Sequence, residues 1–568
     1  MNQFYYFDNF KEFQEKASYQ SDKICVYVNS LFFIVVKSTS KFCMSCFEER
    51  LKINKEFNGI FAVSVEKCFV SNYEKNILEY LVISNLDLNQ VLLVDRGNFE
   101  SITIHVTPMD YCSSCIKGNM EISKYEYNFL NSLRGRTEFD FKELVKTIDR
   151  YSGLFKMQFI NANSNYIPMV GTVLYFHEYH NELVGGFGRD SNLNNSKLIS
   201  ILEGLERYYT SSNKEKKDYQ YFSYAELNNS PLKYLSQKKF ESFLGKKVDI
   251  NRCMSWVKAK NVYSKEEVLL PRQFIEYFDE NSEFSKERVY FNTSSGSSLG
   301  STVEEAILFG LFELIERDAF LVYWHGRLKP RMVELSSITD NDIQRLLGII
   351  NLEGYEIRIF DITTEIGIPV FWTHITGTKE YHFSTFTAAG SHLNFRDALK
   401  ASLVECISSL GVYSNMYYDD TEIKYREELV KDYSKVSEMD DHFKLYAHPK
   451  MKDQFSFVND CKVIVYDDLV REYDNNLEML KENSIELLLD AIIKKFKEYY
   501  GNLYYYNFES TYLRNIGLYA VRVFSPNLLP MTFGSDNQVF SKDRISKFVN
   551  YKNYQWDGKI NKLPHPFP

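Results

Sequence analysis

A Glu-x-x-Glu-Arg pattern occurs twice in segments that are otherwise apolar, and it constrains the fold more than any other feature of the chain. Both copies lie in predicted helices, over 196–209 and 303–324. The residues concerned are Glu203, Glu206 and Arg207 in the first helix and Glu313, Glu316 and Arg317 in the second. Carboxylates three residues apart lie on the same face of a helix. Because such apolar helices are buried, their carboxylates require a cationic group inside the protein.

Two further glutamates extend this pattern. Glu305 precedes Glu313 by a little over two helical turns and lies close to the same face, and Glu405 lies in a third predicted helix, over 396–410. Carboxylates hold hard cations such as Mg²⁺, and arginines hold phosphate groups. The helices therefore predict a site for Mg²⁺ ions that carry a nucleotide. The residues alone fit an alternative equally well, namely amphipathic helices with solvated glutamates.

Four of the nine cysteines form two Cys-x-x-Cys pairs, which are Cys43 with Cys46 and Cys112 with Cys115. Two such pairs make a closed tetrahedral thiolate site of the kind that holds structural Zn²⁺. Strands predicted at 60–63, 91–94 and 102–106 lie between the pairs, so a metal ion would join distant ends of a small sheet. A redox dithiol and chance spacing are the alternatives.

The order of predicted helices and strands indicates an α/β (α+β) fold. The 568 residues suffice for more than one domain. We expect a small zinc-binding domain over 1–120 and a larger domain over 121–568. A glycine-rich turn is predicted at 185–188, a Ser/Gly loop at 293–301 and an exposed, charged insertion at 418–452.

Charge and hydropathy exclude several classes of protein. The 67 Lys and Arg and 76 Asp and Glu give a net charge of −9, with both signs mixed and without a basic stripe, so we expect no contact with nucleic acid. The longest apolar run near the N-terminus, 31–36, is too short to cross a membrane. Scattered cysteines argue against a disulfide scaffold, and we expect a cytoplasmic protein.

Five separated motifs resemble those of the YcaO family and occur in the same order over about residues 125–568. They are Glu203-Gly-Leu-Glu206-Arg207, Gly296 to Gly300 with the helix start at Glu305, Glu313-Leu-Ile-Glu316-Arg317-Asp318-Ala319, Gly390-Ser-His392 to Glu405, and the PxPxP end Pro564-His-Pro566-Phe-Pro568. The N-terminal segment with the cysteine pairs resembles the zinc-bearing end of the ThiF-like partner that is fused to many cyclodehydratases.

This resemblance implies an ATP-dependent cyclodehydratase of bacteriocin-like peptide biosynthesis. Such an enzyme activates backbone amides of a ribosomal precursor peptide and converts Cys, Ser or Thr to thiazoline or oxazoline rings. The residues implied as Mg²⁺ ligands are Glu203, Glu206, Glu305, Glu313 and Glu316. Those implied in nucleotide binding besides them are Arg207, Arg317, Arg189 and Ser200, and those implied in catalysis are Glu405 and the terminal carboxylate of Pro568.

The resemblance also implies partners. The N-terminal residues are taken up by the zinc module, so we expect a separate ThiF-like protein to bind the leader of the precursor peptide. Family members tend to form homodimers, and we expect one here. Whether a flavin dehydrogenase then oxidises the azolines stays open.

Five positions differ from the family pattern, while the five Mg²⁺ glutamates remain. These positions are Ile199, Ser295, Ser301, Ala401 and Ser408. The sequence therefore favours a divergent active enzyme and leaves a catalytically reduced scaffold subunit as the alternative. A related amide activation, such as thioamide formation, is a third hypothesis, which the PxPxP end disfavours.

Overall fold

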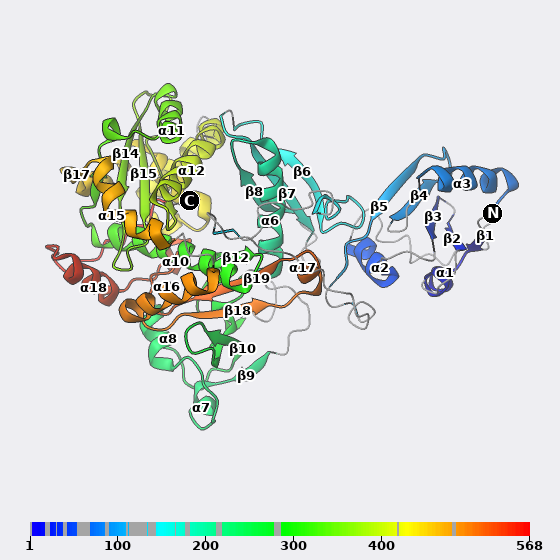
Figure 1. Ribbon diagram of the computed structural model, residues 1–568, viewed down its shortest axis with the longest axis horizontal. Coiled ribbons are helices and arrows are strands. Elements are labelled where there is room, and N and C mark those ends of the chain that lie inside the picture. Colours follow the sequence, from blue (N-terminus) through cyan, green and yellow to red (C-terminus); the bar gives the residue numbers. More distant parts are fainter. Residues whose placement is uncertain are drawn as a thin grey trace.

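The computed structural model describes residues 3–17, 23–29, 31–37, 43–53, 69–85, 90–109, 112, 133–134, 144–164, 166–175, 182–211, 219–277, 286–416, 420–479 and 484–567. Within these ranges, helices alternate with strands that form four sheets, which confirms the predicted α/β (α+β) class. The N-terminal sheet lies at one end of an elongated molecule and the other three sheets lie toward the opposite end (Figure 1).

The N-terminal sheet has the strand order β1-β2-β3-β4-β5, with β1 and β2 parallel and the other pairs antiparallel. Its strands are β1 (Gln3–Phe7), β2 (Lys23–Val28), β3 (Phe32–Lys37), β4 (Gln90–Asp95) and β5 (Ser101–His105). Alternating side chains pack one face against α1 (Phe10–Ala17) and α2 (Met44–Ile53) and the other against α3 (Asn72–Asn85). Strands β4 and β5 confirm two predictions, and the strand predicted at 60–63 lies outside the described residues.

The first acidic helix, α6 (Leu193–Thr210), packs on an antiparallel sheet of β6 (Phe155–Ile160), β7 (Met169–Tyr175) and β8 (Glu182–Arg189). The prediction of a turn at 185–188 is wrong, because these residues belong to β8. A Cβ atom on Gly188 would lie 1.8 Å from the Ser196 carbonyl oxygen, and one on Gly186 would lie 2.4 Å from the Gly204 amide nitrogen. The glycines therefore allow the strand to lie directly against the helix.

The second acidic helix, α10 (Val303–Gly326), packs against both of the larger sheets. One sheet has the order β11-β10-β18-β19-β12 with β9 beside β10, and the other has the order β16-β15-β14-β13-β17. The strands of the first are β9 (Gln220–Phe222), β10 (Met254–Asn261), β11 (Glu267–Pro271), β12 (Ser297–Gly300), β18 (Tyr504–Phe508) and β19 (Tyr519–Phe524). Those of the second are β13 (Arg331–Val333), β14 (Tyr355–Asp361), β15 (Val370–Gly377), β16 (Thr385–Ser391) and β17 (Lys462–Ile464). Helix α10 is apolar around most of its surface, which explains its burial.

The remaining helices cover the outer faces of these sheets and the ends of the molecule (Figure 1). They are α7 (Tyr224–Leu227), α8 (Gln237–Leu244), α11 (Asn341–Leu352), α12 (Phe395–Met416), α13 (Asp420–Lys431), α14 (Met439–Ala447), α15 (Tyr466–Met479), α16 (Ile485–Tyr500), α17 (Thr511–Asn515) and α18 (Lys542–Lys552). The prediction of an exposed insertion at 418–452 is wrong for α13 and α14, because they bury Leu429, Phe443 and Tyr446 in the core.

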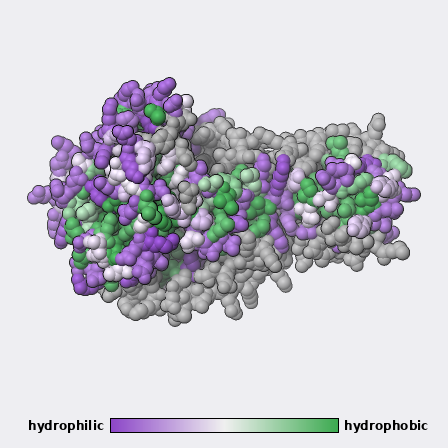
Figure 2. Space-filling view, turned by 90° about the horizontal axis from the view of Figure 1, so that it is seen from above, coloured by the Kyte–Doolittle hydropathy of each residue, from purple (hydrophilic) through white to green (hydrophobic). Residues whose placement is uncertain are grey.

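The predicted domain boundary at residue 120 lies outside the described residues. The N-terminal sheet ends at His105, and the next sheet begins at Phe155. The segment before Phe155 contacts the N-terminal sheet, since the Asp149 carboxylate accepts the His105 N–H at 3.0 Å and the Ser152 hydroxyl donates to the His105 carbonyl at 2.8 Å. Hydrophobic and hydrophilic side chains are interspersed on the face seen in Figure 2. Among the described helices, none is long and apolar enough to cross a membrane.

Candidate functional site

Glutamates from α6, α10 and α12 lie in one region. The charges of Glu313 and Glu203 raise the pKa of Glu206, and the charges of Glu405 and Glu313 raise the pKa of Glu316, in both cases after burial as the main cause. These five residues from three helices, here named the acidic cluster, are therefore close enough for their charges to interact. The sequence predicted that both Glu-x-x-Glu-Arg segments contribute to one site, and the structure brings them together.

Glutamates of the acidic cluster accept hydrogen bonds from backbone N–H groups of neighbouring segments. Glu203 accepts the Phe187 N–H of β8 at 2.9 Å and is paired with Arg207 at 2.6 Å. Glu313 accepts the Gly296 N–H at 2.9 Å, in the loop that precedes β12. Gly296 has φ +85, and a Cβ atom there would lie 2.5 Å from a backbone oxygen of β19, so only glycine fits this approach.

Glu305 lies at the start of α10 and is almost fully buried. It accepts the Ser301 N–H at 3.1 Å and the Ser301 hydroxyl, and it forms an ion pair with Arg134 at 3.1 Å. The charge of Arg134 also counteracts the raised pKa of the buried Glu206 carboxyl.

Burial raises the pKa of three carboxyls in the cluster above the usual range of glutamate. Burial raises the pKa of Glu206 well above the usual value, and it raises the pKa of Glu316 to about 8, with the charge of Arg317 acting in the opposite direction. Buried carboxylates that repel one another carry their charge at low cost only beside a cation. Oxygen ligands in this arrangement fit Mg²⁺, which prefers carboxylates and the oxygens of a bound phosphate chain.

A narrow cavity beside Arg317 is lined by donors that lack acceptors. Among the described residues, four buried nitrogen atoms there have no hydrogen-bond partner, namely Nε and Nη1 of Arg317, Nε of Arg522 and Nδ2 of Asn292. Arg522 otherwise donates to the Ser297 hydroxyl at 3.0 Å and to Asn292. Buried donors of this kind indicate a missing acceptor, and two guanidinium groups fit phosphate oxygens.

The predicted residues Arg189 and Ser200 have different surroundings. Arg189 ends β8, where its buried Nε has no hydrogen-bond partner among the described residues, and it counteracts the raised pKa of the buried Tyr413 hydroxyl on α12. The hydroxyl of Ser200 accepts a hydrogen bond from Gln158 at 2.8 Å and donates to the Lys197 carbonyl at 2.9 Å, so it lies in the contact between α6 and β6.

The five positions that depart from the family pattern have the following surroundings. Ser301 binds Glu305, and Ser295 lines the cavity beside Arg317. The fully buried Ser408 hydroxyl donates to the Glu405 carbonyl of its own helix at 3.0 Å. Ala401 and Ile199 are exposed.

The C-terminal segment is buried along α10 and is not a frayed tail. The Tyr446 hydroxyl donates to the Pro564 carbonyl at 2.6 Å, and the Thr387 hydroxyl donates to the Pro566 carbonyl at 3.3 Å. The ring of Phe567 is fully buried against Phe320. The prediction that Pro568 takes part in catalysis concerns a residue outside the described ranges, and it stays a prediction.

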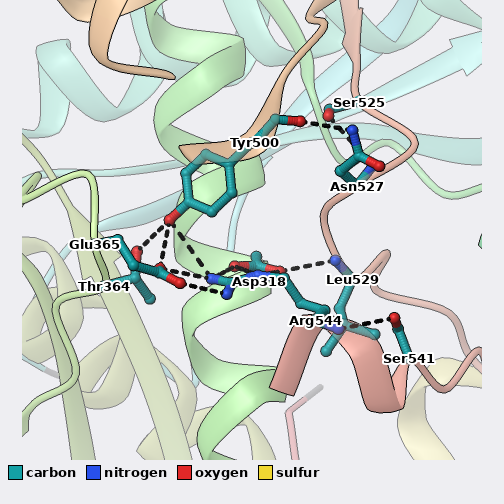
Figure 3. A network of polar contacts seen from close by, with 9 residues as sticks. All are labelled: Asp318, Thr364, Glu365, Tyr500, Ser525, Asn527, Leu529, Ser541 and Arg544. Atoms are coloured by element: carbon teal, nitrogen blue, oxygen red, sulfur yellow. Dashed lines mark hydrogen bonds and ion pairs between the residues drawn. The ribbon is translucent and has the colours of Figure 1, made fainter. Parts of the chain in front are cut away.

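A buried ion network includes Asp318, the residue after Arg317 (Figure 3). Arg544 of α18 donates to Asp318 at 2.6 Å and to Glu365 at 2.7 Å. Asp318 also accepts the Leu529 N–H at 2.8 Å. Because Leu529 lines the cavity and Asp318 directly follows Arg317, the network fixes the cavity wall relative to the acidic helix.

The thiols of Cys43, Cys46 and Cys112 form a separate cluster in the N-terminal part. Their sulfur atoms lie within 4.8 Å of one another, with Cys43 and Cys112 at 3.4 Å. Zn–S bonds of about 2.3 Å require sulfur atoms at about this spacing. The Met109 N–H donates to the Cys46 sulfur at 3.3 Å, which favours a thiolate. The fourth predicted ligand, Cys115, lies outside the described residues.

The sequence analysis missed Arg522, Asn292 and Arg134. Arg522 lies within the apolar strand β19, where a single arginine is the only signal of a polar partner. Asn292 lies in the loop before β12. Its hydrogen bond with Arg522 forms only because β12 pairs with β19, a strand far away in the sequence. No recognisable motif surrounds Arg134 in the sequence, so spacing alone does not indicate its contact with Glu305.

Relatives of this chain share part of its length. An uncharacterized protein of Methanothermobacter thermautotrophicus is 28% identical over 175 residues, which is 30% of this chain and 45% of that protein. An uncharacterized protein in the tfuA 3′ region of Rhizobium leguminosarum bv. trifolii is 32% identical over 116 residues, which is 17% of this chain and 28% of that protein. The chain thus spans less than half the length of these two curated relatives.

Solved structures share the fold at low identity. A heterocyclase in complex with substrate and cofactor has a TM-score of 0.69 at 16% identity and covers 99% of this chain and 81% of its own. The heterocyclase TruD has a TM-score of 0.61 at 15% identity, covering 100% of this chain and 79% of its own. YcaO from Methanopyrus kandleri bound with AMPPCP and Mg²⁺ has a TM-score of 0.51 at 14% identity, covering 71% and 95%.

A match to a family model assigns the chain to a family. The family model described as YcaO cyclodehydratase, ATP- and Mg²⁺-binding, matches residues 187–529. This range includes α6, α10 and α12, and therefore every residue of the acidic cluster. Since the match covers more than half of the chain, the protein belongs to the YcaO cyclodehydratase family.

Proposed function

We propose that the protein is an ATP-dependent cyclodehydratase that converts Cys, Ser or Thr residues of a ribosomal precursor peptide to thiazoline or oxazoline rings. One observation carries this proposal. The acidic cluster, which needs cations, lies next to a cavity whose buried arginine donors need an anion, and Arg317 belongs to both places. Bound Mg-ATP would satisfy both requirements at once.

The chemistry follows from the poor leaving group of an amide. A side-chain thiol or hydroxyl of the peptide adds to the preceding backbone carbonyl, and the resulting oxygen is expelled only after it has received the γ-phosphoryl group of ATP. ADP and phosphate are then the by-products. In this proposal, Glu203, Glu206, Glu305, Glu313 and Glu316 hold Mg²⁺, while Arg317, Arg522 and Asn292 hold phosphate oxygens. Glu405 and the Pro568 carboxylate are proposed to accept the proton that the attacking group loses.

The remaining predictions belong to the same proposal. Zn²⁺ is proposed to bind Cys43, Cys46, Cys112 and Cys115 as a structural ion, because the three described thiols are already clustered. A separate ThiF-like protein is proposed to bind the leader of the precursor peptide. We place the enzyme in the cytoplasm, where precursor peptide and Mg-ATP are both present.

Calorimetric titration of Mg-ATP into the full-length chain tests the nucleotide site without a peptide or a partner. Wild type should bind, and Glu316→Gln should weaken binding by at least about tenfold, because one buried ligand charge is lost. Glu498→Gln is the matched control, since this glutamate is exposed on α16. Equal binding by all three proteins would contradict the proposed Mg²⁺ site.

Peptide processing then separates the enzyme from a scaffold. The chain, a candidate precursor and its leader-binding partner are incubated with Mg-ATP, and mass spectrometry measures the loss of one water per ring. Rings in the wild type and none with Glu316→Gln support the enzyme. Processing that is unaffected by Glu316→Gln supports the scaffold, because another subunit then carries out the chemistry.

A further inference from the structure

A second cavity, of about 360 Å³, lies at the C-terminal end of α10, beside the first strand of the β13–β17 sheet. Four of its lining residues are basic, namely Lys329, Arg331, Lys462 and Lys552, and one is acidic, Asp361. This cavity is here named the basic pocket. It shares no lining residue with the cavity beside Arg317. Tyr323, on its wall, follows Glu316 by seven residues, which is about 10 Å along the helix.

Three of the four basic residues of the basic pocket have no ion-pair partner among the residues that the structure describes. Arg331 is paired with Asp361 and with Glu472. Among the described side chains, no carboxylate lies within ion-pair distance of the ammonium groups of the three lysines. The whole chain carries a net charge of −9, so a hollow lined by three lysines without a described carboxylate partner differs from the average surface of the protein. Charges of one sign around a hollow concentrate the electric field there.

The walls of the basic pocket are held in place by the buried ion network (Figure 3). Asp318, Glu365 and Arg544 of that network belong to α10, the β14–β15 loop and α18. The same three elements supply Tyr323, Thr363 and Lys552 to the pocket. Three of the elements that line the pocket are therefore joined to one another by buried ion pairs.

We propose that the basic pocket binds a small multivalent anion that carries phosphate or carboxylate groups. Basic side chains that line one hollow repel each other, and a bound anion would reduce this repulsion through charge-assisted hydrogen bonds. The volume lies within the range of small-molecule sites. The Tyr554 hydroxyl, 3.5 Å from that of Tyr323, adds a neutral donor or acceptor to the pocket. This inference does not depend on the proposed cyclodehydratase function.

Calorimetric titration of pyrophosphate and of citrate into the full-length chain tests the proposal. Divalent metal ions are first removed with a chelating resin, because a soluble chelator such as EDTA is itself a multivalent carboxylate anion, and ionic strength is held constant. Wild type should bind at least one of them, and the double variant Lys462→Gln/Lys552→Gln should bind at least about tenfold more weakly. The matched control is Lys238→Gln/Lys246→Gln, two exposed lysines in and after α8.

The control double variant should bind like wild type, and Mg-ATP binding in a separate titration should be unchanged in both double variants. Tighter binding of pyrophosphate would assign a phosphate ligand, and tighter binding of citrate would assign a carboxylate ligand. The proposal is overturned if neither anion saturates wild type in the millimolar range. It is also overturned if Lys462→Gln/Lys552→Gln binds like wild type, or if both double variants weaken binding equally.

Discussion

The guanidinium group of Arg317 lies 4.2 Å from the centre of the Phe567 ring. This contact joins the acidic helix α10 to the C-terminal segment. The ring covers one face of the guanidinium, while Nε and Nη1 have no hydrogen-bond partner among the described residues. The tail therefore contacts an arginine that lines the cavity that we assign to phosphate groups.

This contact predicts that the ring of Phe567 contributes to nucleotide binding. Phe567→Leu keeps most of the buried volume but removes the cation–π contact, which is worth about 0.5–2 kcal/mol. We expect Mg-ATP binding, measured by calorimetry, to weaken up to about thirtyfold. Phe496→Leu, at a buried ring of α16, is the control and should leave binding unchanged. Equal affinities for wild type and Phe567→Leu would show that Arg317 is oriented without the ring.

The raised pKa of the buried Glu316 carboxyl predicts how the free energy of unfolding changes with pH. Its pKa is about 8 in the folded protein, whereas an unfolded glutamate has a pKa of about 4.3. Between these values the folded state holds a proton that the unfolded state lacks, so stability falls as pH rises. In EDTA, wild type should lose up to about 1.4 kcal/mol per pH unit relative to Glu316→Gln, whose amide does not titrate.

Urea unfolding of both proteins between about pH 5 and about pH 8 measures this difference, and saturating Mg²⁺ should reduce it. Groups remote from Glu316 titrate alike in wild type and variant, so they cancel in the comparison. A difference that stays constant over the whole pH range would mean that Glu316 titrates as an ordinary carboxyl.

The sequence predicted the parts of the site that local spacing controls. Glu203 with Glu206, and Glu313 with Glu316, share helix faces because their spacing matches the helical repeat, and the apolar residues around them require burial. Arg522 and Asn292 were not predictable in this way. Their contact depends on the pairing of β12 with β19, two strands that are far apart in the chain.

Two local patterns were misleading for physical reasons. Glycines at 185–188 suggest a turn, yet they form a strand because α6 approaches β8 too closely for any Cβ atom at Gly188. The charged segment 418–452 suggests solvent exposure. Each of its two helices nevertheless buries apolar residues in the core, Leu429 in α13 and Tyr446 in α14. In both cases a tertiary contact decided the outcome.

The thiol cluster predicts one tightly bound Zn²⁺ per chain. Removal of the Cys43 ligand by Cys43→Ser should abolish stoichiometric zinc, measured by elemental analysis, and should lower the unfolding temperature of the N-terminal part. Cys253→Ser is the control, because this thiol is exposed and remote from the cluster. Zinc that is retained at one equivalent in Cys43→Ser would point to other ligands.

The buried ion network predicts a large effect on stability at Arg544. The side chains of Arg544, Asp318 and Glu365 are 4%, 1% and 5% exposed, so the loss of the single cation leaves two carboxylates buried without a charge partner. Arg544→Met should lower the free energy of unfolding by about 3–5 kcal/mol, measured by urea unfolding. Lys547→Met removes an exposed ion pair with Asp543 from the same helix and should cost at most about 1 kcal/mol. If both variants cost the same, the network contributes no more than a surface pair, and another contact must hold α18 against α10.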